Sequence, residues 1–217
     1  MRTVGCSVSE WSHAAHRQGG PPARGAGSRT PNPAPSGRRC RRRRIPCLLS
    51  SPSTVSIRRA NPGDAERVAA IYNEGIADRE ATFETRPRSK AEVAGWTVGP
   101  LPVLVAEVDG RVVGFGKIGS YSERPVYAGI GEHGVYVAGA ARRLGVGRAL
   151  LGALAEAGAE AGLYKLTSRI FTTNTASIAL HEAAGFTIVG VQRRHGQLGG
   201  VWRDCVLVER LLGDAAE

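Results

Sequence analysis

The stretch Arg142-Arg143-Leu144-Gly145-Val146-Gly147-Arg148 constrains the fold of this chain most strongly, because it joins a strand-like segment to a helix-like one. Residues 129–137 before it read as a strand that carries three glycines, and residues 145–161 after it are rich in alanine and leucine until Gly162. The start of such a helix leaves backbone N–H groups unpaired and partly positive, which suits a bound phosphate. The stretch therefore predicts a strand, an anion-binding loop and a helix in succession.

Further strand and helix patterns extend this unit in both directions. Strands are expected at residues 56–60, 101–108, 112–119, 129–137, 165–171, 186–191 and 201–209, and helices after residues 61–64 and at 145–161 and 174–184. Asp109-Gly110 predicts a tight hairpin turn. The glycines of residues 129–137 predict either a bulge or a close approach to the backbone, and residues 195–200 a glycine-rich loop between the last two strands. The order β-α-(α)-β-β-β-α-β-α-β-β predicts a mixed α/β fold with helices on the faces of one sheet.

Composition divides the chain into a basic tail and a nearly neutral body. Residues 1–54 hold ten arginines, one acidic residue and seven of the twelve prolines, whereas residues 55–217 hold 19 basic and 18 acidic side chains. The tail is expected to be disordered. It reads either as a basic arm or import sequence, or as an untranslated stretch before a true start at Val55. The expected divisions are this tail, a domain over residues 55–212 and a C-terminal tail over residues 213–217.

The composition of the body also excludes several classes of protein. No apolar run approaches the 18 residues needed to span a bilayer, so a membrane-spanning protein is not expected. The neutral body gives no sign of nucleic-acid or membrane binding, although the basic tail, if translated, is able to bind polyanions weakly. Cys205 is the only cysteine of the body, which argues against a disulfide framework and for a reducing compartment.

The anion-binding loop does not match two better-known phosphate loops. It has no Gly-Lys-Ser/Thr sequence, and Leu150 stands where the dinucleotide fingerprint requires a small residue. Instead, glycines allow an anion to approach the backbone and neighbouring arginines supply charge-assisted hydrogen bonds. The candidate anion-binding residues are Arg142, Arg143, Gly145, Val146, Gly147 and Arg148. Ordinary surface arginines at a glycine-containing helix start are the alternative interpretation.

Two stretches of the sequence resemble the GNAT N-acetyltransferases. Arg142-x-x-Gly145-x-Gly147 resembles their acyl-CoA pyrophosphate loop, and the pattern from Asn174 through Ser177, His181 and Glu182 to Gly185-Phe186 resembles their last conserved helix. A closer resemblance is to the phosphinothricin, methionine sulfoximine and arsinothricin N-acetyltransferases. It is carried by Ile71-Tyr72-Asn73, residues 81–85 (ATFET), residues 121–127 (YSERPVY), Gly131-Glu132 and Val135-Tyr136-Val137.

The resemblance implies a fold, a co-substrate and an acceptor. The fold is the three-layer GNAT type, with a central, mostly antiparallel, splayed mixed sheet flanked by helices. The co-substrate is acetyl-CoA without a metal, and the acceptor is the α-amine of a small amino-acid-like antimetabolite, so that acetylation confers resistance. The resemblance also implies a cytoplasmic homodimer. A protein or peptide N-terminal acetyltransferase, or a non-catalytic acyl-CoA-binding module, is the alternative.

Catalytic roles follow from the same resemblance. Glu132 matches the family's proposed general base, whereas His133 points to the opposite face of the strand by alternation. The backbone N–H groups of Val135, Tyr136 and Val137, freed by the bulge, are the expected donors to the thioester oxygen. Asn174, Ser177 and His181 share one helix face because their spacing is close to whole helical turns, and that face is expected to meet the pantetheine arm. His181 replaces the tyrosine that many members use as an acid for the thiolate, so it is expected either to orient or to shuttle a proton.

The acceptor pocket is expected to contain Phe83, Tyr121 and Tyr127, with Arg124 as the arginine that binds a carboxylate. Sheet packing is the alternative role for the two tyrosines. The chain departs from the phosphinothricin enzymes at Leu198, which replaces their usual lysine near Trp202. That form looks more like the arsinothricin branch.

Overall fold

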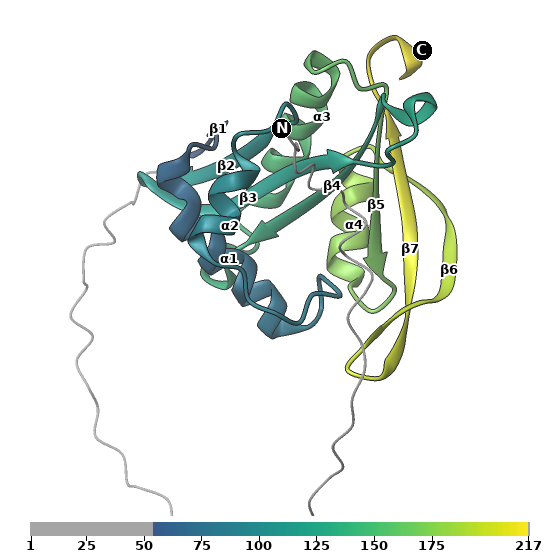
Figure 1. Cartoon of the computed structure of the whole chain (residues 1–217), viewed down its shortest axis with the longest axis horizontal. Coiled ribbons are helices and arrows are strands. Elements are labelled where there is room, and N and C mark those ends of the chain that lie inside the picture. Colours follow the sequence, from purple (N-terminus) through teal and green to yellow (C-terminus); the bar gives the residue numbers. More distant parts are fainter. Residues whose placement is uncertain (1–53, 217) are drawn as a thin grey trace, which may run out of the picture. The chain divides into compact units, whose positions relative to one another are not determined.

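The computed structural model describes residues 54–216, which form one seven-stranded sheet with helices on both faces (Figure 1). The strand order is β1-β2-β3-β4-β5-β7-β6, and every neighbouring pair is antiparallel except β4 and β5. The strands are β1 (Val55–Arg59), β2 (Val103–Val108), β3 (Arg111–Ser120), β4 (Ile130–Val137), β5 (Lys165–Phe171), β6 (Thr187–Leu198) and β7 (Val201–Leu211). The predicted element order and mixed α/β class are confirmed, and the tail of residues 1–53 lies outside the described residues.

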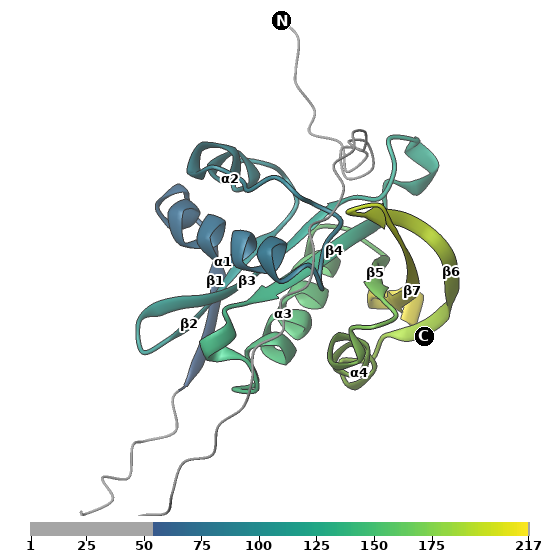
Figure 2. The same cartoon turned by 90° about the horizontal axis from the view of Figure 1, so that it is seen from below.

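Helices cover both faces of the sheet (Figure 2). The helices are α1 (Ala65–Asp78) and α2 (Lys90–Trp96) on one face, and α3 (Val146–Glu160) and α4 (Thr175–Ala183) on the other. Strand alternation separates the two cores: Val105 of β2 packs with α1 and α2, whereas its neighbours Leu104 and Ala106 pack with α3. The result is the three-layer arrangement that the family resemblance implies.

Helix α3 lies at the centre of the larger core. Leu150, Leu151 and Leu154 are completely buried on the face that meets the sheet, since residues three and four apart share a helix face. Gly145 precedes the helix in the left-handed conformation with φ +81°, and Gly162 follows it with φ +82°. Both ends of α3 are therefore set by glycines that the sequence shows.

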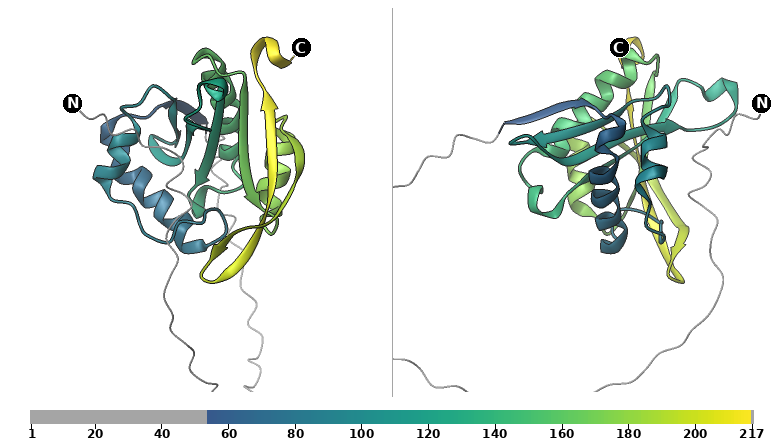
Figure 3. Two further views of the ribbon diagram at one scale, coloured as in Figure 1. Left: turned by 45° about the vertical axis from the view of Figure 1, so that its right-hand side comes forward. Right: turned by 60° about the vertical axis from the view of Figure 1, so that its left-hand side comes forward.

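Strands β4 and β5 part from each other soon after they meet. Their parallel pairing covers only Ile130 to Glu132 against Lys165 to Thr167, and beyond these residues the two strands diverge (Figure 3). Strand β4 remains paired with β3 along its other edge as far as Val137. The edge of β4 that faces β5 is consequently open from His133 onward.

The expected bulge in residues 129–137 is wrong, because the β3–β4 register is continuous from Gly131 to Val137. The open edge of β4 comes from its separation from β5 instead. The glycines allow close packing, because a Cβ on Gly131 would lie 2.5 Å from Ile118 Cγ2 and one on Gly129 would clash with the Tyr164 ring. The alternative of a close approach is thus correct, with the protein's own side chains as the neighbours.

The expected loop over residues 195–200 is also wrong. Strand β6 continues to Leu198, and only Gly199 and Gly200 form the turn, with φ of +61° and +79°. Leu198 holds the strand in place because it is buried with Phe171 and Cys205 in a small third core. At the C-terminus, Gly213–Ala216 form a short 3-10 turn after β7.

Candidate functional site

A large cavity opens where β4 and β5 separate. Its volume is about 990 Å³, and it runs between the start of α3, the edge of β4, strand β5, helix α4 and the segment after α1. Fourteen of the predicted site residues line it: Phe83, Tyr121, Glu132, Val135, Tyr136, Val137, Arg142, Arg143, Gly145, Gly147, Arg148, Asn174, Ser177 and His181. Arg124, Tyr127 and Val146 do not line this cavity.

The start of α3 forms the anion-binding end of the cavity. Gly145 has no side-chain cap on the helix, and a Cβ there would meet nothing within 4 Å, so its backbone is accessible. Gly147 has a different reason to be glycine, because a Cβ would lie 2.8 Å from Leu180 of α4. Val146 is buried in the core, so only its backbone is able to contribute to binding. The first turn of α3 therefore offers backbone donors at the cavity.

The arginines of this loop differ in their contacts. Arg142 forms an ion pair with Asp78 at the end of α1, with 2.6 Å between Nη2 and Oδ2, and this pairing raises the pKa of the guanidinium. Arg143 adopts a positive φ of 66°, and both it and Arg148 are exposed. Arg142 thus links α1 to the loop, while the other two present charge to an anion.

The middle of β4 contributes its backbone to the cavity. The Tyr136 side chain is buried in the α1–α2 core, stacked on Phe115 at 5.2 Å and edge-on to Tyr72 at 4.8 Å between ring centroids. Burial raises the pKa of Tyr136 well above its ordinary value, which keeps the phenol neutral. Tyr136 therefore anchors the strand whose open edge faces the cavity.

Glu132 is part of an ion pair that crosses the gap between the diverging strands. Arg169 of β5 donates from Nη1 to Glu132 Oε1 at 2.5 Å and from Nε to Gln192 Oε1 of β6 at 3.2 Å. The pair is partly buried, with side chains 22% exposed for Glu132 and 26% for Arg169. His195 lines the same end of the cavity, where burial and, to a smaller extent, the charge of Arg169 lower its pKa, and Glu132 partly offsets them. This end of the cavity thus holds an acid, a permanent cation and a neutral imidazole.

His181 forms a buried chain with His133. Nδ1 of His181 lies 2.7 Å from the Ser177 carbonyl, so Nδ1 carries the proton, and Nε2 of His181 lies 3.1 Å from Nε2 of His133. Since Nε2 of His181 must then accept, the hydrogen between the two rings belongs to His133. Both nitrogens of His181 are consequently engaged within the protein.

Burial keeps these two histidines neutral. Desolvation, together with the nearby His181, lowers the pKa of His133 to about 3, and desolvation also lowers the pKa of His181. Nδ1 of His133 is buried without a side-chain hydrogen-bond partner, and the Thr167 backbone offsets part of the lowering of the His133 pKa. In this geometry His181 presents no N–H to the cavity, which favours the orienting role over the acidic one.

Asn174 caps α4 and fastens it to the segment after α1. Its Oδ1 accepts from the Ser177 N–H at 3.0 Å, and its Nδ2 donates to the Glu80 carbonyl at 3.1 Å. The amide therefore has contacts at both ends, and it holds residues 80–83 beside the cavity.

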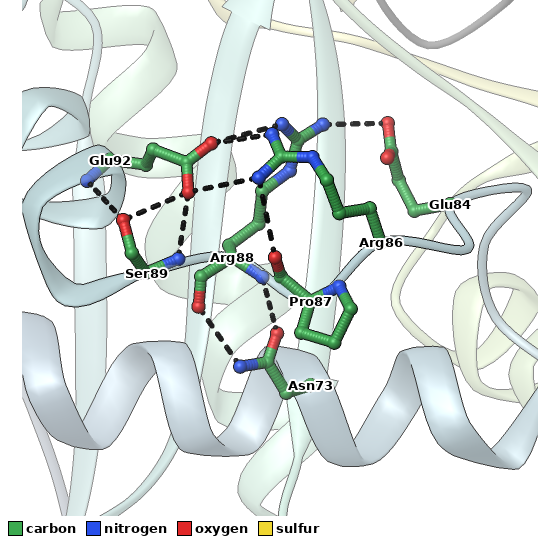
Figure 4. A network of polar contacts seen from close by, with 7 residues as sticks. All are labelled: Asn73, Glu84, Arg86, Pro87, Arg88, Ser89 and Glu92. Atoms are coloured by element: carbon green, nitrogen blue, oxygen red, sulfur yellow. Dashed lines mark hydrogen bonds and ion pairs between the residues drawn. The ribbon is translucent and has the colours of Figure 1, made fainter. Parts of the chain in front are cut away.

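The residues that follow this segment, 84–92, are held by a polar network (Figure 4). The Asn73 amide of α1 accepts from the Arg88 N–H at 2.8 Å and donates to the Arg88 carbonyl at 3.0 Å. The Arg88 guanidinium forms ion pairs with Glu84 at 2.9 Å and Glu92 at 3.4 Å. Because Ser89 and Glu92 also cap α2 reciprocally, the network ties residues 84–92 to α1.

Only some of the acceptor-binding residues expected from the sequence line the cavity. Phe83 lines the cavity and packs edge-on against Phe171, with 4.7 Å between ring centroids. Tyr121 lines the cavity too and is edge-on to Tyr127 at 6.0 Å. Arg124 is exposed, with its guanidinium 5.4 Å from the centroid of the Tyr127 ring. The cation expected for a carboxylate thus lies outside the cavity.

Among the lining residues that the sequence does not single out are Lys117, Arg169 and His195. Arg169 carries a readable signal, because it is the one charged residue among the apolar and hydroxylic side chains of residues 166–171. Lys117 lies in β3 with its ammonium 4.2 Å from the centroid of the Trp96 ring. His195 gives no such signal, because the glycines after it predict a loop.

Two further kinds of feature are absent from residues 54–216. None of the helices there is long and apolar enough to cross a bilayer. No group of three or more histidine, cysteine, aspartate or glutamate side chains in this part of the chain is arranged to hold a metal ion.

Comparisons with known proteins place these features in a family. Residues 68–186 match the acetyltransferase (GNAT) family. The chain is 33% identical over 161 residues to the L-methionine sulfoximine/L-methionine sulfone acetyltransferase of Pseudomonas aeruginosa, covering 72% of this chain and 94% of that protein. It is 36% identical over 163 residues to the phosphinothricin N-acetyltransferase of Alcaligenes faecalis, covering 72% and 82%.

A solved structure agrees with these relatives. The phosphinothricin acetyltransferase of Sinorhizobium meliloti in complex with acetyl-CoA superposes with a TM-score of 0.70 at 31% identity, covering 74% of this chain and 90% of that one. The sheet that opens between β4 and β5, the glycine loop at the start of α3 and these matches agree, and the chain belongs to the acetyltransferase (GNAT) family as an N-acetyltransferase.

Proposed function

We propose that this protein transfers an acetyl group from acetyl-CoA to the α-amine of a small amino-acid-like acceptor. The observation that carries the proposal is the continuous cavity, which has unpaired backbone donors of α3 at one end and the Glu132–Arg169 pair at the other. Relatives named for methionine sulfoximine, methionine sulfone and phosphinothricin support an acceptor of this size and class.

The residues present fit acetyl-CoA as the co-substrate. The accessible backbone at Gly145 and the exposed Arg143 and Arg148 suit the diphosphate, and a volume of about 990 Å³ accommodates an extended pantetheine chain. When bound, acetyl-CoA supplies an activated acetyl group and accepts one proton on its departing thiolate. The open edge of β4 at Val135 to Val137 provides backbone groups along which the chain of the co-substrate is able to lie.

Glu132 is the residue proposed to take the proton from the acceptor amine. Its Oε1 is engaged by Arg169, which leaves the second carboxylate oxygen outside that ion pair and available to an ammonium group. A positioned carboxylate of this kind contributes a factor of about 10² to 10⁴ as a general base. His181, whose nitrogens face Ser177 and His133, is proposed to orient α4 against β4 and not to protonate the thiolate.

Steady-state release of free CoA tests this function. The protein is incubated with acetyl-CoA, a thiol reagent and, in separate reactions, phosphinothricin, arsinothricin, methionine sulfoximine, methionine sulfone, ordinary amino acids and short peptides. Acceptor-dependent release with at least one free amino acid, and weaker release with the peptides, supports the proposal. Release with none of them contradicts it.

The remaining expectations are proposed on the same basis: resistance to a glutamate-like antimetabolite, arsinothricin among the acceptors, a cytoplasmic location and a homodimer. The dimer is supported by an exposed apolar surface on the edge strand β6 and its neighbour β7. That surface contains Ile188, Val189, Val191, Val201 and Trp202. Light scattering of the pure protein at micromolar concentration distinguishes a dimer from a monomer, and a monomer contradicts this part.

A further inference from the structure

The two opposite charges of the Glu132–Arg169 pair are complementary to those of a zwitterion. A free amino acid carries an ammonium and a carboxylate separated by one carbon, whereas Glu132 and Arg169 present a carboxylate and a guanidinium in direct contact at 2.5 Å. Placed against each other, the two dipoles bring each charge of the ligand onto the opposite charge of the protein. This complementarity selects ligands that bear both charges close together.

Arg169 has hydrogen-bonding capacity beyond its two contacts. A guanidinium carries five N–H donors, and one donor on Nη1 serves Glu132 while Nε serves Gln192. These two contacts fix the plane of the group from β4 on one side and β6 on the other. The remaining donors belong to a residue that lines the cavity and is only 26% exposed, where a charge-assisted hydrogen bond is stronger than in open water.

The arginine expected for this role lies elsewhere. Arg124 is exposed on the segment between β3 and β4, lies against Tyr127, and does not line the cavity that contains Glu132. Lys117 is the other cation at the acceptor end, and its ammonium lies against the Trp96 ring. Of the cations that line the cavity, Arg169 is the one in contact with Glu132, the carboxylate proposed to take the proton of the amine.

We infer that Arg169 binds the α-carboxylate of the acceptor while Glu132 receives its α-amine, so that the ion pair makes the enzyme specific for free amino acids. This inference rests on the proposed function and deepens it, because it names the charge pattern that the acceptor must carry. It predicts that removal of the acceptor's carboxylate charge weakens binding even when the side chain is unchanged.

Paired acceptors test the inference. CoA release is measured with L-methionine sulfone and with its α-amide, in the wild type and in Arg169→Met, Arg169→Lys, Arg124→Met and the exposed control Arg193→Met. The wild type is expected to prefer the free acid by at least tenfold in kcat/KM, mainly through KM. Arg169→Met is expected to remove most of this preference by raising KM for the acid about tenfold or more, with a smaller effect on the amide.

The variants separate this inference from its alternatives. Arg169→Lys keeps the charge but loses the planar fork, so it is expected to retain part of the preference, which a purely structural role would not require. It also serves as the test if Arg169→Met fails to fold by circular dichroism. An equal fall in kcat for both acceptors with the preference intact, or loss of the preference in Arg124→Met alone, overturns the inference. Wild-type protein that acetylates neither compound nor any other amine contradicts the proposed function, whereas wild-type turnover without a preference contradicts only the role of Arg169.

Discussion

The buried histidine pair makes the stability of this protein sensitive to mild acid. An unfolded histidine titrates with a pKa near 6.5, whereas burial and the neighbouring His181 lower the pKa of His133 to about 3. Below pH 6.5 the unfolded chain therefore binds a proton that the folded chain does not. The stabilisation by the neutral His133 is complete above pH 6.5 and is lost progressively as the pH falls toward 3.

The size of the effect follows from this difference in pKa. Each pH unit below 6.5 costs about 1.4 kcal/mol, so His133 alone lowers the free energy of unfolding by about 2 kcal/mol between pH 7 and pH 5. For a domain of this size, that corresponds to a fall of roughly 4–8 °C in Tm. A loss of this size is a substantial part of the ~5–15 kcal/mol that stabilises a typical domain.

The variant His133→Gln tests this reasoning, because glutamine is able to donate to Nε2 of His181 but does not titrate. Thermal unfolding is followed by circular dichroism at pH 7 and pH 5 for the wild type and the variant. The drop in Tm between the two pH values is expected to be smaller in the variant by the amount given above. Identical drops in both proteins, with similar Tm at pH 7, would refute the assignment of a neutral, buried His133.

Three further predictions concern catalysis, packing and the segment over the cavity. Glu132→Gln is expected to lower kcat by about 10² or more with little change in KM for acetyl-CoA, measured by CoA release. Leu150→Ala, which removes a completely buried side chain of α3, is expected to destabilise the protein by about 2–5 kcal/mol in urea unfolding. Asn73→Ala removes both hydrogen bonds to the Arg88 backbone and is expected to raise the acceptor KM several-fold while leaving that for acetyl-CoA nearly unchanged.

A different result for any of the three variants would contradict the corresponding prediction. Full activity of Glu132→Gln would mean that another group or water takes the amine proton. A loss below about 1 kcal/mol for Leu150→Ala would contradict a tightly packed α3. An equal rise in both KM values for Asn73→Ala would mean that the network acts on the whole fold and not on the acceptor side.

Much of the fold was predictable because its signals are local. Asp109-Gly110 forms the expected turn with positive φ at both residues, and Gly145 and Gly162 bound α3 where the alanine- and leucine-rich run begins and ends. The β6–β7 hairpin differs from the expected long loop, which its glycines predict, because the burial of Leu198 depends on Phe171, a residue distant in sequence. Composition alone does not reveal such contacts.

The sequence predicts the backbone elements of the site better than the contacts between its charged and polar side chains. The glycine loop and Glu132 have a recognisable pattern, and they line one cavity. The contact between Glu132 and Arg169 depends on how far β4 and β5 diverge. The hydrogen bond between His133 and His181 depends on how α4 packs on β4. Both are tertiary facts that spacing along the chain does not carry.

A crystal structure of the protein with CoA and the N-acetylated product tests the central claim most directly. The account predicts the diphosphate on the backbone N–H groups around Gly145, the pantetheine along the open edge of β4, and the product amide beside Glu132. A diphosphate bound away from the start of α3, or a product bound outside the cavity between β4 and β5, would contradict it.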